Sequence, residues 1–396
     1  MQNETAMSSL KGRIRAVLFG IAYGDAIGAP IEKLSAAQIR QRYGRVTSLN
    51  TQWHRISESE TVRLGRVRGN GIVTDDTHMT LCLMSVYNDV KRHIDAWDMA
   101  TGMVREIAQT PRWLAELQRE GMLIERLFYP EKWIFQRHQL AGCDPREGGI
   151  GNMVNCGAAM YIAPVGVVNA CDPVRAYDEA IAFASGHQQS FGLEAAGVLS
   201  AAIAAAFIPG ATIDAVVKTA LSVAKDGTRN AIYDIVDAAQ TLKQADYQTQ
   251  VDTFHRIIQK YSPMGDNVFH STRQPGGATD AYRPSRLNSI EELPLALGFA
   301  VINEGDFYKT IHDGINSGRD TDSIGVMAGA ILGALHGESI IDAAAMQQIE
   351  GPNRLELFAC ADAFSETVLT IQQADRAADK AKNSARDALV IPAAIR

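Results

Sequence analysis

The chain has 396 residues, of which 46% are hydrophobic, so it is long enough to bury a sizeable core. The formal net charge of −7 argues against nucleic acid as a partner, although a local basic pocket for a phosphorylated ligand is compatible with it. Five widely spaced cysteines argue against a disulfide framework, and no C-x-x-C pair indicates a zinc site.

Helical periodicity dominates the chain from the start. Residues 10–30 place apolar side chains on one side, and Pro30 is expected to break that helix. Further helices are predicted over 191–207, 212–225, 292–303, 306–317 and 324–337. Thr212 is a plausible N-cap of the second of these. The last fifty residues are rich in alanine and charge, as in an exposed helix. The best strand candidates are only 45–50 and 161–169, so the predicted fold class is all-α.

Two stretches of the sequence bear on cellular location and on contact with a membrane. Residues 1–13 lack the apolar core of a signal peptide. The most apolar long run, 195–208, is mostly alanine and too short to span a bilayer. We therefore expect a cytoplasmic protein without a membrane partner.

Three segments interrupt the helices, at 35–70, 143–151 and 262–289. Loops of this length in a compact domain are usually functional or disordered, and substrate specificity is expected in the first and third. None of them has the character of an interdomain linker. We predict one domain over 1–396, with a motif core at about 12–337 and a helical C-terminal extension at 338–396.

Two rows of glycines recur every four residues, at Gly20, Gly24 and Gly28 and again at Gly325, Gly329 and Gly333. Each glycine costs a helix about 1 kcal/mol relative to alanine. On one stripe of a helix, they allow a neighbouring backbone to come unusually close. Tight helix packing is the simplest interpretation, and such helices could also hold nearby carboxylates rigidly.

Two groups of oxygen-bearing side chains begin apolar helices at opposite ends of the chain. These candidate metal ligands are Thr74, Asp75, Asp76, Asp320, Asp322 and Ser323. Hard divalent cations prefer oxygen ligands. The alternative is helix capping, because an aspartate in a first turn complements exposed amides and the helix dipole.

Further polar residues have open roles. Asp25 suits a buried cap or polar anchor, and Glu32 follows it by seven residues. His187 comes after a small-residue turn, where a structural role is the commoner one for a lone histidine. No Ser-His-Asp constellation can be assigned, and GGIGN does not complete a G-x-G-x-x-G pattern.

Five segments in a fixed order resemble the ADP-ribosylglycohydrolase family: GIAYGDAIGAPIE, TDDTHMTLCL, NCGAAMYIAPVG, SGHQQSFGLEAA and GRDTDSIGVMAGAILGAL. The resemblance covers most of the chain. It implies a compact single-domain orthogonal helical bundle and a binuclear centre of two Mg²⁺ (or Mn²⁺) ions. It also implies hydrolysis of the bond between C1″ of ADP-ribose and an acceptor.

The resemblance assigns roles residue by residue. Thr74, Asp75 and Asp76 match the first metal motif, and Asp320, Asp322 and Ser323 match the second. Serine at 323 replaces the threonine of many relatives and keeps the hydroxyl. Glu32 matches a glutamate that is catalytic in the serine-type hydrolases of the family. The candidate catalytic residues are Glu32, Asp75 and Asp76, and the proton could be transferred by Glu32 or by a metal-held aspartate.

An ADP-ribose-binding role is implied for the third and fourth motifs, at Asn155, Gly157, Ala158, Met160 and His187. Here the chain departs from the family pattern. It has Asn-Cys-Gly at 155–157 where relatives usually have Gly-Asn-Gly. Tyr161 stands where they often have arginine or serine, and Gln189 replaces a second histidine.

The expected function is therefore hydrolysis, as an N- or O-glycosyl hydrolase, of ADP-ribose from an acceptor, in the first place an ADP-ribosylated arginine. The substrate would be an ADP-ribosylated protein or a small molecule. Two alternatives stay open. One is a hydrolase of a small ADP-ribosyl metabolite or another modified acceptor; the other is a non-catalytic ADP-ribose binder, since the family also contains lens crystallins. Oligomeric state is not indicated.

Overall fold

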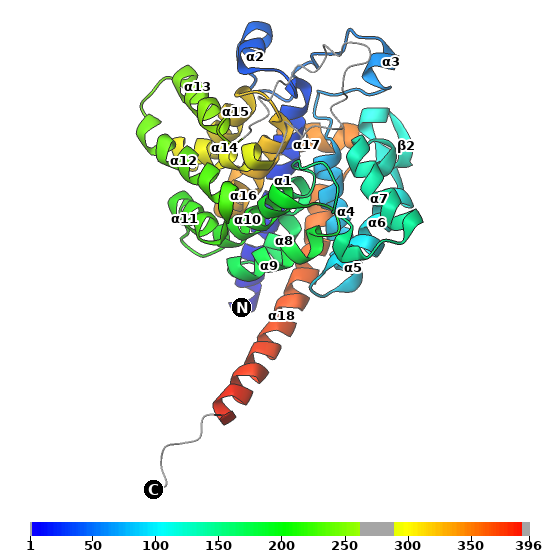
Figure 1. Ribbon diagram of the computed structural model, residues 1–396, viewed down its shortest axis with the longest axis vertical. Coiled ribbons are helices and arrows are strands. Elements are labelled where there is room, and N and C mark those ends of the chain that lie inside the picture. Colours follow the sequence, from blue (N-terminus) through cyan, green and yellow to red (C-terminus); the bar gives the residue numbers. More distant parts are fainter. Residues whose placement is uncertain (1, 262–288, 390–396) are drawn as a thin grey trace.

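Helices make up most of the computed structural model, which describes residues 2–261 and 289–389 (Figure 1). The helices of the first half are α1 (Gln2–Gly28), α2 (Ala36–Tyr43), α3 (Glu60–Arg63), α4 (Asp75–Val90), α5 (Ala96–Asp98), α6 (Val104–Ala108), α7 (Tyr129–Ala141), α8 (Ala163–Val168) and α9 (Pro173–Ala184). Those of the second half are α10 (Ser190–Ala206), α11 (Ile213–Val223), α12 (Asp226–Leu242), α13 (Tyr247–Ile258), α14 (Ser289–Ile302), α15 (Phe307–Asn316), α16 (Thr321–His336), α17 (Ala343–Asn353) and α18 (Leu357–Leu389). The all-α prediction is confirmed.

Strands are confined, within the described residues, to one antiparallel pair and a few isolated bridges. The pair is β1 (Pro111–Leu114) with β2 (Arg119–Met122). Both predicted strands are wrong. Residues 45–50 are irregular. The segment 161–169 begins at the end of a 3-10 turn (Ala159–Tyr161) and then contains α8, which Pro164 helps to begin. A short, fully buried apolar run gives no periodicity that separates a strand from a helix.

The predicted helices occur where the apolar spacing placed them. The segment predicted at 191–207 lies in α10 except for its last residue, and the segment predicted at 212–225 contains α11. The hydroxyl of Thr212 caps α11 by accepting a hydrogen bond from the amide of Ala215 at 3.3 Å. The insert at 35–70 contains α2 and α3, and that at 262–289 lies outside the described residues except for its last one.

The two glycine rows face each other across one helix pair. A Cβ on Gly20 would overlap the backbone of Gly329, and one on Gly24 would overlap the backbone of Gly325. The pairing is antiparallel, so Gly28 at the end of α1 meets Thr321 and Asp322 at the start of α16. The Thr321 hydroxyl donates to the Gly28 carbonyl at 2.8 Å. We call this contact the glycine seam; it brings the ends of two motif-bearing helices together.

The other helices surround the seam. The alanine-rich α10 is almost entirely buried and packs against α8, α9, α11 and α16, while α14 packs against α12 and α16. Near the end of the chain, α18 packs on α1 and α4 and then projects from the body (red in Figure 1). Ile371 is the last fully buried side chain of α18, and the turns after it are largely exposed.

Two helical stretches, Leu10–Ile31 and Thr321–Ile340, are long and apolar enough by length and composition to cross a membrane. They contain the two partners of the glycine seam, and 94% and 78% of their windows are buried inside the molecule. A core helix satisfies the same criterion, so this is weak evidence for a membrane span.

Candidate functional site

Asp25, near the end of α1, is fully buried beside the beginning of α4. Its Oδ2 accepts hydrogen bonds from the amide of Thr74 (2.9 Å) and from the amide (3.2 Å) and hydroxyl (2.5 Å) of Thr77. Asp25 therefore caps α4 from a different helix, in the anchoring role that the sequence allowed. Among the described residues, nothing donates a hydrogen bond to its other oxygen, Oδ1, which is also buried.

The two groups of candidate metal ligands meet at the starts of α4 and α16. The hydroxyl of Ser323 donates to Oδ1 of Asp76 at 3.0 Å, and the hydroxyl of Thr74 lies 3.3 Å from Oδ2 of the same carboxylate. Asp75, Asp76, Asp320 and Asp322 are all buried. Residues about 245 positions apart in sequence thus share one site, because the glycine seam and the Asp25 cap join three helix ends.

Helix capping does not account for these carboxylates. Asp320 occupies the N-cap position of α16, but its side chain makes no capping hydrogen bond. At α4 it is the hydroxyl of Thr74 that caps, accepting from the amide of Asp76 at 3.4 Å. Capping hydrogen bonds therefore do not explain why Asp76 and Asp320 are buried here. Asp75 pairs with Arg126, and Asp322 accepts from the amide of Ser323 at 3.2 Å.

Glu32 joins the cluster from the turn that follows α1. Its carboxylate pairs with Arg68 and with Lys33, whose Nζ lies 3.1 Å away. Backbone hydrogen bonds of 2.8 Å between Lys33 and Arg319 and between Arg319 and Leu34 hold this turn beside α16. As a result, one oxygen each of Glu32, Asp320 and Asp322 lie within 4.8 Å of one another.

Burial, together with the crowding of like charges, raises the pKa of most of the aspartates. Burial, followed by the neighbouring Asp322, raises the pKa of Asp25 to about 7. Burial and then Glu32 raise the pKa of Asp322 to about 6. The pKa values of Asp76 and Asp320 are also well above the ordinary range, because of burial and then Asp322. A bound cation would relieve this repulsion.

Glu32 behaves in the opposite way. Burial alone would raise its pKa, but the charges of Lys33 and Arg68 outweigh burial, so the pKa is lowered. Glu32 is therefore ionised at neutral pH. Its surroundings thus favour the charged form, unlike those of Asp76, Asp320 and Asp322.

A buried chain of alternating charges extends from the cluster, and no motif in the sequence indicates it. Arg68 binds Glu32 and places Nε 2.8 Å from Oε1 of Glu116; Arg126 binds Oε2 of Glu116 and also Asp75. Burial would raise the pKa of Glu116, but Arg126 and Arg68 lower it to about 2. The guanidinium of Arg68 is thus buried against carboxylates.

Cys156 also reaches the cluster. Its Sγ lies 3.2 Å from Oδ2 of Asp320 and 3.4 Å from the hydroxyl of Ser323. Together with Glu292 and Asp320 it forms a second group whose ligand atoms lie within 4.8 Å of one another. The departure from Gly-Asn-Gly at 155–157 was the signal that could have identified this thiol.

The candidate ADP-ribose-binding residues lie around a second buried polar network. Glu131 of α7 accepts from Nδ2 of Asn155 (2.7 Å) and pairs with Nε2 of His187 (2.8 Å). The other ring nitrogen of His187 lies 2.7 Å from the Tyr161 hydroxyl, and the histidine has no exposed surface. His187 thus anchors the loop before α10 and lies too deep for contact with a ligand in this conformation.

The remaining members of that set line the loop itself. The amide of Gly157 donates to Oδ1 of Asn155 at 2.9 Å, and a Cβ on Gly157 would collide with Glu131. Ala158 and Met160 are buried in the core. The loop is therefore held against α7, and Cys156 within it points to the carboxylate cluster.

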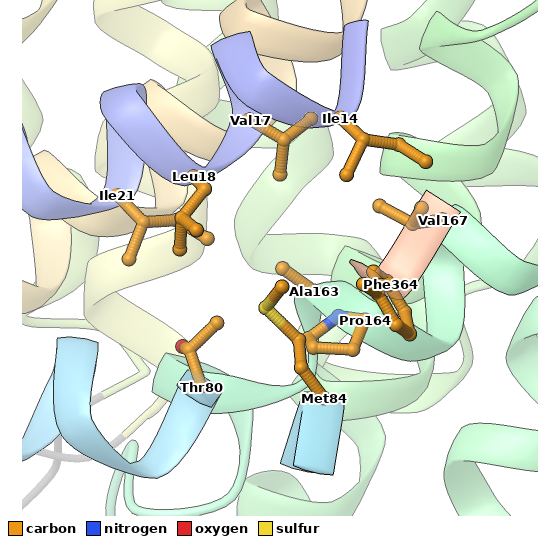
Figure 2. A pocket seen from close by; sticks show the side chains of 10 residues that line it. All are labelled: Ile14, Val17, Leu18, Ile21, Thr80, Met84, Ala163, Pro164, Val167 and Phe364. Carbon is orange, nitrogen blue, oxygen red and sulfur yellow. The ribbon is translucent and has the colours of Figure 1, made fainter. Parts of the chain in front are cut away.

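A separate pocket is apolar and does not include the cluster (Figure 2). Side chains from α1, α4, α8 and α18, among them Leu18, Met84 and Phe364, point into it. Thr80 contributes a hydroxyl, but this group donates to the backbone carbonyl of Asp76 at 2.8 Å. The pocket lacks the charged side chains that a polar sugar phosphate would require.

The chain is similar to known proteins over most of its length. The model of the ADP-ribosylglycohydrolase family matches residues 6–377. The chain is 23% identical over 367 residues to the uncharacterized protein YegU of Escherichia coli (89% of this chain, 96% of that one). It is 23% identical over 329 residues to an uncharacterized protein of Archaeoglobus fulgidus (82% and 88%). A solved structure described as an ADP-ribosylglycohydrolase-related protein complex superposes with a TM-score of 0.60 at 18% identity. The superposition covers 91% of this chain and 99% of that one and shows the shared fold.

The family match extends over nearly the whole chain, including both carboxylate motifs, and the chain belongs to the ADP-ribosylglycohydrolase family.

Proposed function

We propose that this protein is a metal-dependent hydrolase that cleaves the glycosidic bond between ADP-ribose and an acceptor, with an ADP-ribosylated arginine side chain as its first substrate. The observation that carries the proposal is the meeting of buried carboxylates from α4 and α16, joined by the Ser323–Asp76 hydrogen bond. Such a concentration of negative charge is costly to bury unless a cation compensates it.

The residues present fit two hard divalent cations, Mg²⁺ or Mn²⁺. The donor set is dominated by carboxylate and hydroxyl oxygens, which these ions prefer. One buried oxygen of Asp25 has no hydrogen-bond partner among the described residues, and the pKa values of Asp76, Asp320 and Asp322 are raised. Both observations support a deficit of positive charge at the site. The proposed ligands are Thr74, Asp75, Asp76, Asp320, Asp322 and Ser323. When bound, the ions would orient the ribose hydroxyls and lower the pKa of a water molecule.

Glu32 is the proposed general base. Its carboxylate stays ionised at neutral pH because Lys33 and Arg68 lower its pKa, and its oxygens lie beside those of Asp320 and Asp322. It would accept a proton from the water that attacks C1″. Glycoside cleavage develops positive charge on the sugar ring, and the surrounding carboxylates would stabilise that charge.

We propose that the loop at 155–160 lines the ADP-ribose site. The amide of Gly157 is already engaged by Asn155, so Asn155, Gly157, Ala158 and Met160 would act through the shape of the loop. His187 and Glu131 would keep that shape by holding Asn155 in place. This changes the proposed role of His187 from ligand contact to positioning.

Replacement of Asp320 by alanine tests the proposal. Asp320→Ala should abolish binding of one divalent ion, measured by calorimetry, and lower turnover by about 100-fold or more, because ligand and charge are lost together. The metal-free variant should unfold at a temperature no lower than the wild type, since a repelled buried carboxylate has been removed.

Asp237→Ala is the matched control, since this exposed aspartate lies on α12 away from the cluster. It should change neither metal binding nor turnover. Products from ADP-ribosyl-arginine, ADP-ribosyl-serine and ADP-ribose 1″-phosphate should be analysed in parallel, with arginine expected as the preferred leaving group. Unchanged turnover in Asp320→Ala, or ADP-ribose binding without turnover of any of the three, would contradict the proposal.

A further inference from the structure

Arg68 introduces a fixed positive charge into the side of the cluster formed by Glu32 and Asp322. Its Nη1 binds Oε2 of Glu32 and lies 3.9 Å from Oδ2 of Asp322. The same nitrogen donates to the carbonyl of Ala29 at 3.3 Å. The guanidinium therefore lies against two of the three carboxylates whose oxygens are close enough to share one ion.

Glu116 holds this guanidinium in place. Its side chain binds Nε of Arg68 at 2.8 Å, and its backbone carbonyl accepts from the amide of Val67, also at 2.8 Å. Its second carboxylate oxygen binds Arg126, so Glu116 cannot turn away from Arg68 without breaking another buried ion pair. Arg68 itself is only 9% exposed.

We propose that Arg68 is a built-in counter-cation that competes with a divalent ion for Glu32 and Asp322, and that it thereby sets the metal affinity of this side of the cluster. The proposal rests on the proposed function, since it concerns the same carboxylates. Two cations within a few ångströms repel each other strongly in a partly desolvated site. A carboxylate that binds a guanidinium also has fewer lone pairs to offer a metal.

The test is a calorimetric titration of MnCl₂, and separately of MgCl₂, into the full-length chain without nucleotide and at constant ionic strength. Arg68→Gln should bind the divalent ion at least about tenfold more tightly than the wild type, because a nearby positive charge has been removed. Arg112→Gln is the control: it removes the same charge, but from a residue that pairs with Glu106 at 3.0 Å. Its affinity should stay within about threefold of the wild type.

The outcomes separate this proposal from the function on which it rests. Tighter binding by Arg68→Gln than by the wild type supports the proposal about Arg68. If only the variant binds a divalent ion, the proposal about Arg68 is still supported, but the metal dependence proposed for the wild type is overturned. If the wild type binds and Arg68→Gln binds no more tightly, Arg68 is a structural residue and the proposal alone is overturned. Failure of both folded proteins to bind overturns both proposals.

A second variant covers loss of folding. If circular dichroism shows that Arg68→Gln is unfolded, Glu116→Gln provides the test. Without the charge of Glu116, Arg68 would pair more closely with Glu32 and Asp322, so divalent binding should weaken by about threefold or more. Unchanged or tighter binding by a folded Glu116→Gln protein would overturn the proposal.

Discussion

Asp25 and Asp322 have pKa values of about 7 and about 6, whereas both would titrate near the ordinary value of 3.8 in an unfolded chain. Between these limits the folded protein holds more protons than the unfolded chain. Its free energy of unfolding must therefore decrease as the pH rises from about 4 to about 7. A bound divalent ion replaces those protons, so its stabilising effect should be largest at the upper end of this range.

Thermal unfolding at several pH values tests this expectation. In the presence of a chelator, the contribution of these groups should lower Tm as the pH is raised from about 5 to about 7.5. Addition of millimolar Mg²⁺ or Mn²⁺ should raise Tm, and by a larger increment at the higher pH. The Asp237→Ala protein should follow the same curves as the wild type. A metal-induced increment that is larger at the lower pH would contradict the assigned pKa shifts.

At the scale of single residues, the sequence predicts the oxygen donors of the cluster but not the charged side chains that pair with them. Thr74–Asp76 and Asp320–Ser323 stood out because acidic residues precede apolar helices. Glu116 and Arg126 carry no motif, and they reach the cluster only through the packing of segments distant in sequence. Whether such residues form buried ion pairs depends on how deeply they are buried, and burial is set by the tertiary structure.

At the scale of elements, the glycine seam fixes the separation of α1 and α16. A methyl group on Gly24 would meet the backbone of Gly325, which cannot move aside as a flexible side chain could. Gly24→Ala should therefore destabilise the fold by about 3 kcal/mol or more, measured by denaturant unfolding. It should also weaken metal binding, because the helix ends that carry Asp25 and Asp322 would be pushed apart.

Gly351→Ala is the control for this prediction. Gly351 lies within α17, and a Cβ there would meet nothing within 4 Å. The substitution should be neutral or should stabilise the protein by up to about 1 kcal/mol, because alanine favours a helix. Equal effects of the two substitutions would show that the seam is not a close contact in solution.

The sequence predicted close packing at both glycine rows but not that each is the partner of the other. A four-residue repeat shows which face of a helix is small, whereas the choice of partner depends on the whole arrangement. The wrong strand at 161–169 has a related origin, since these residues are apolar because they are buried. Helix type and extent were predictable because α1, α10 and α16 are long and their spacing is regular.

At the scale of the whole molecule, α18 is divided into a packed half and a projecting half (Figure 1). Leu357, Phe364 and Ile371 are buried against the body. The boundary lies near Asp375, which binds His93 at 3.0 Å and Arg175 at 2.8 Å. An isolated helix of the length that follows is only marginally stable in water.

Two truncated chains test how much each half of α18 contributes to stability. A chain that ends after Arg376 should keep its Tm within about 2 °C and its metal affinity, since few contacts are lost. A chain that ends after Asn353 should fail to fold or unfold at a much lower temperature, because it loses buried Leu357, Phe364 and Ile371. Limited trypsin digestion should cut first at Lys380, Lys382 or Arg386. A large loss of Tm from the shorter deletion would show that the projecting half is covered in solution.

The glycine seam has a consequence for biosynthesis. One of its helices is synthesised long before the other, because more than ten other helices lie between α1 and α16 along the described chain. The apolar surface of α1 stays uncovered until α16 has been synthesised, and contacts between such remote segments are slow to form. Nascent chains should therefore depend on chaperones during most of translation, and the site should gain its capacity for metal in one late step.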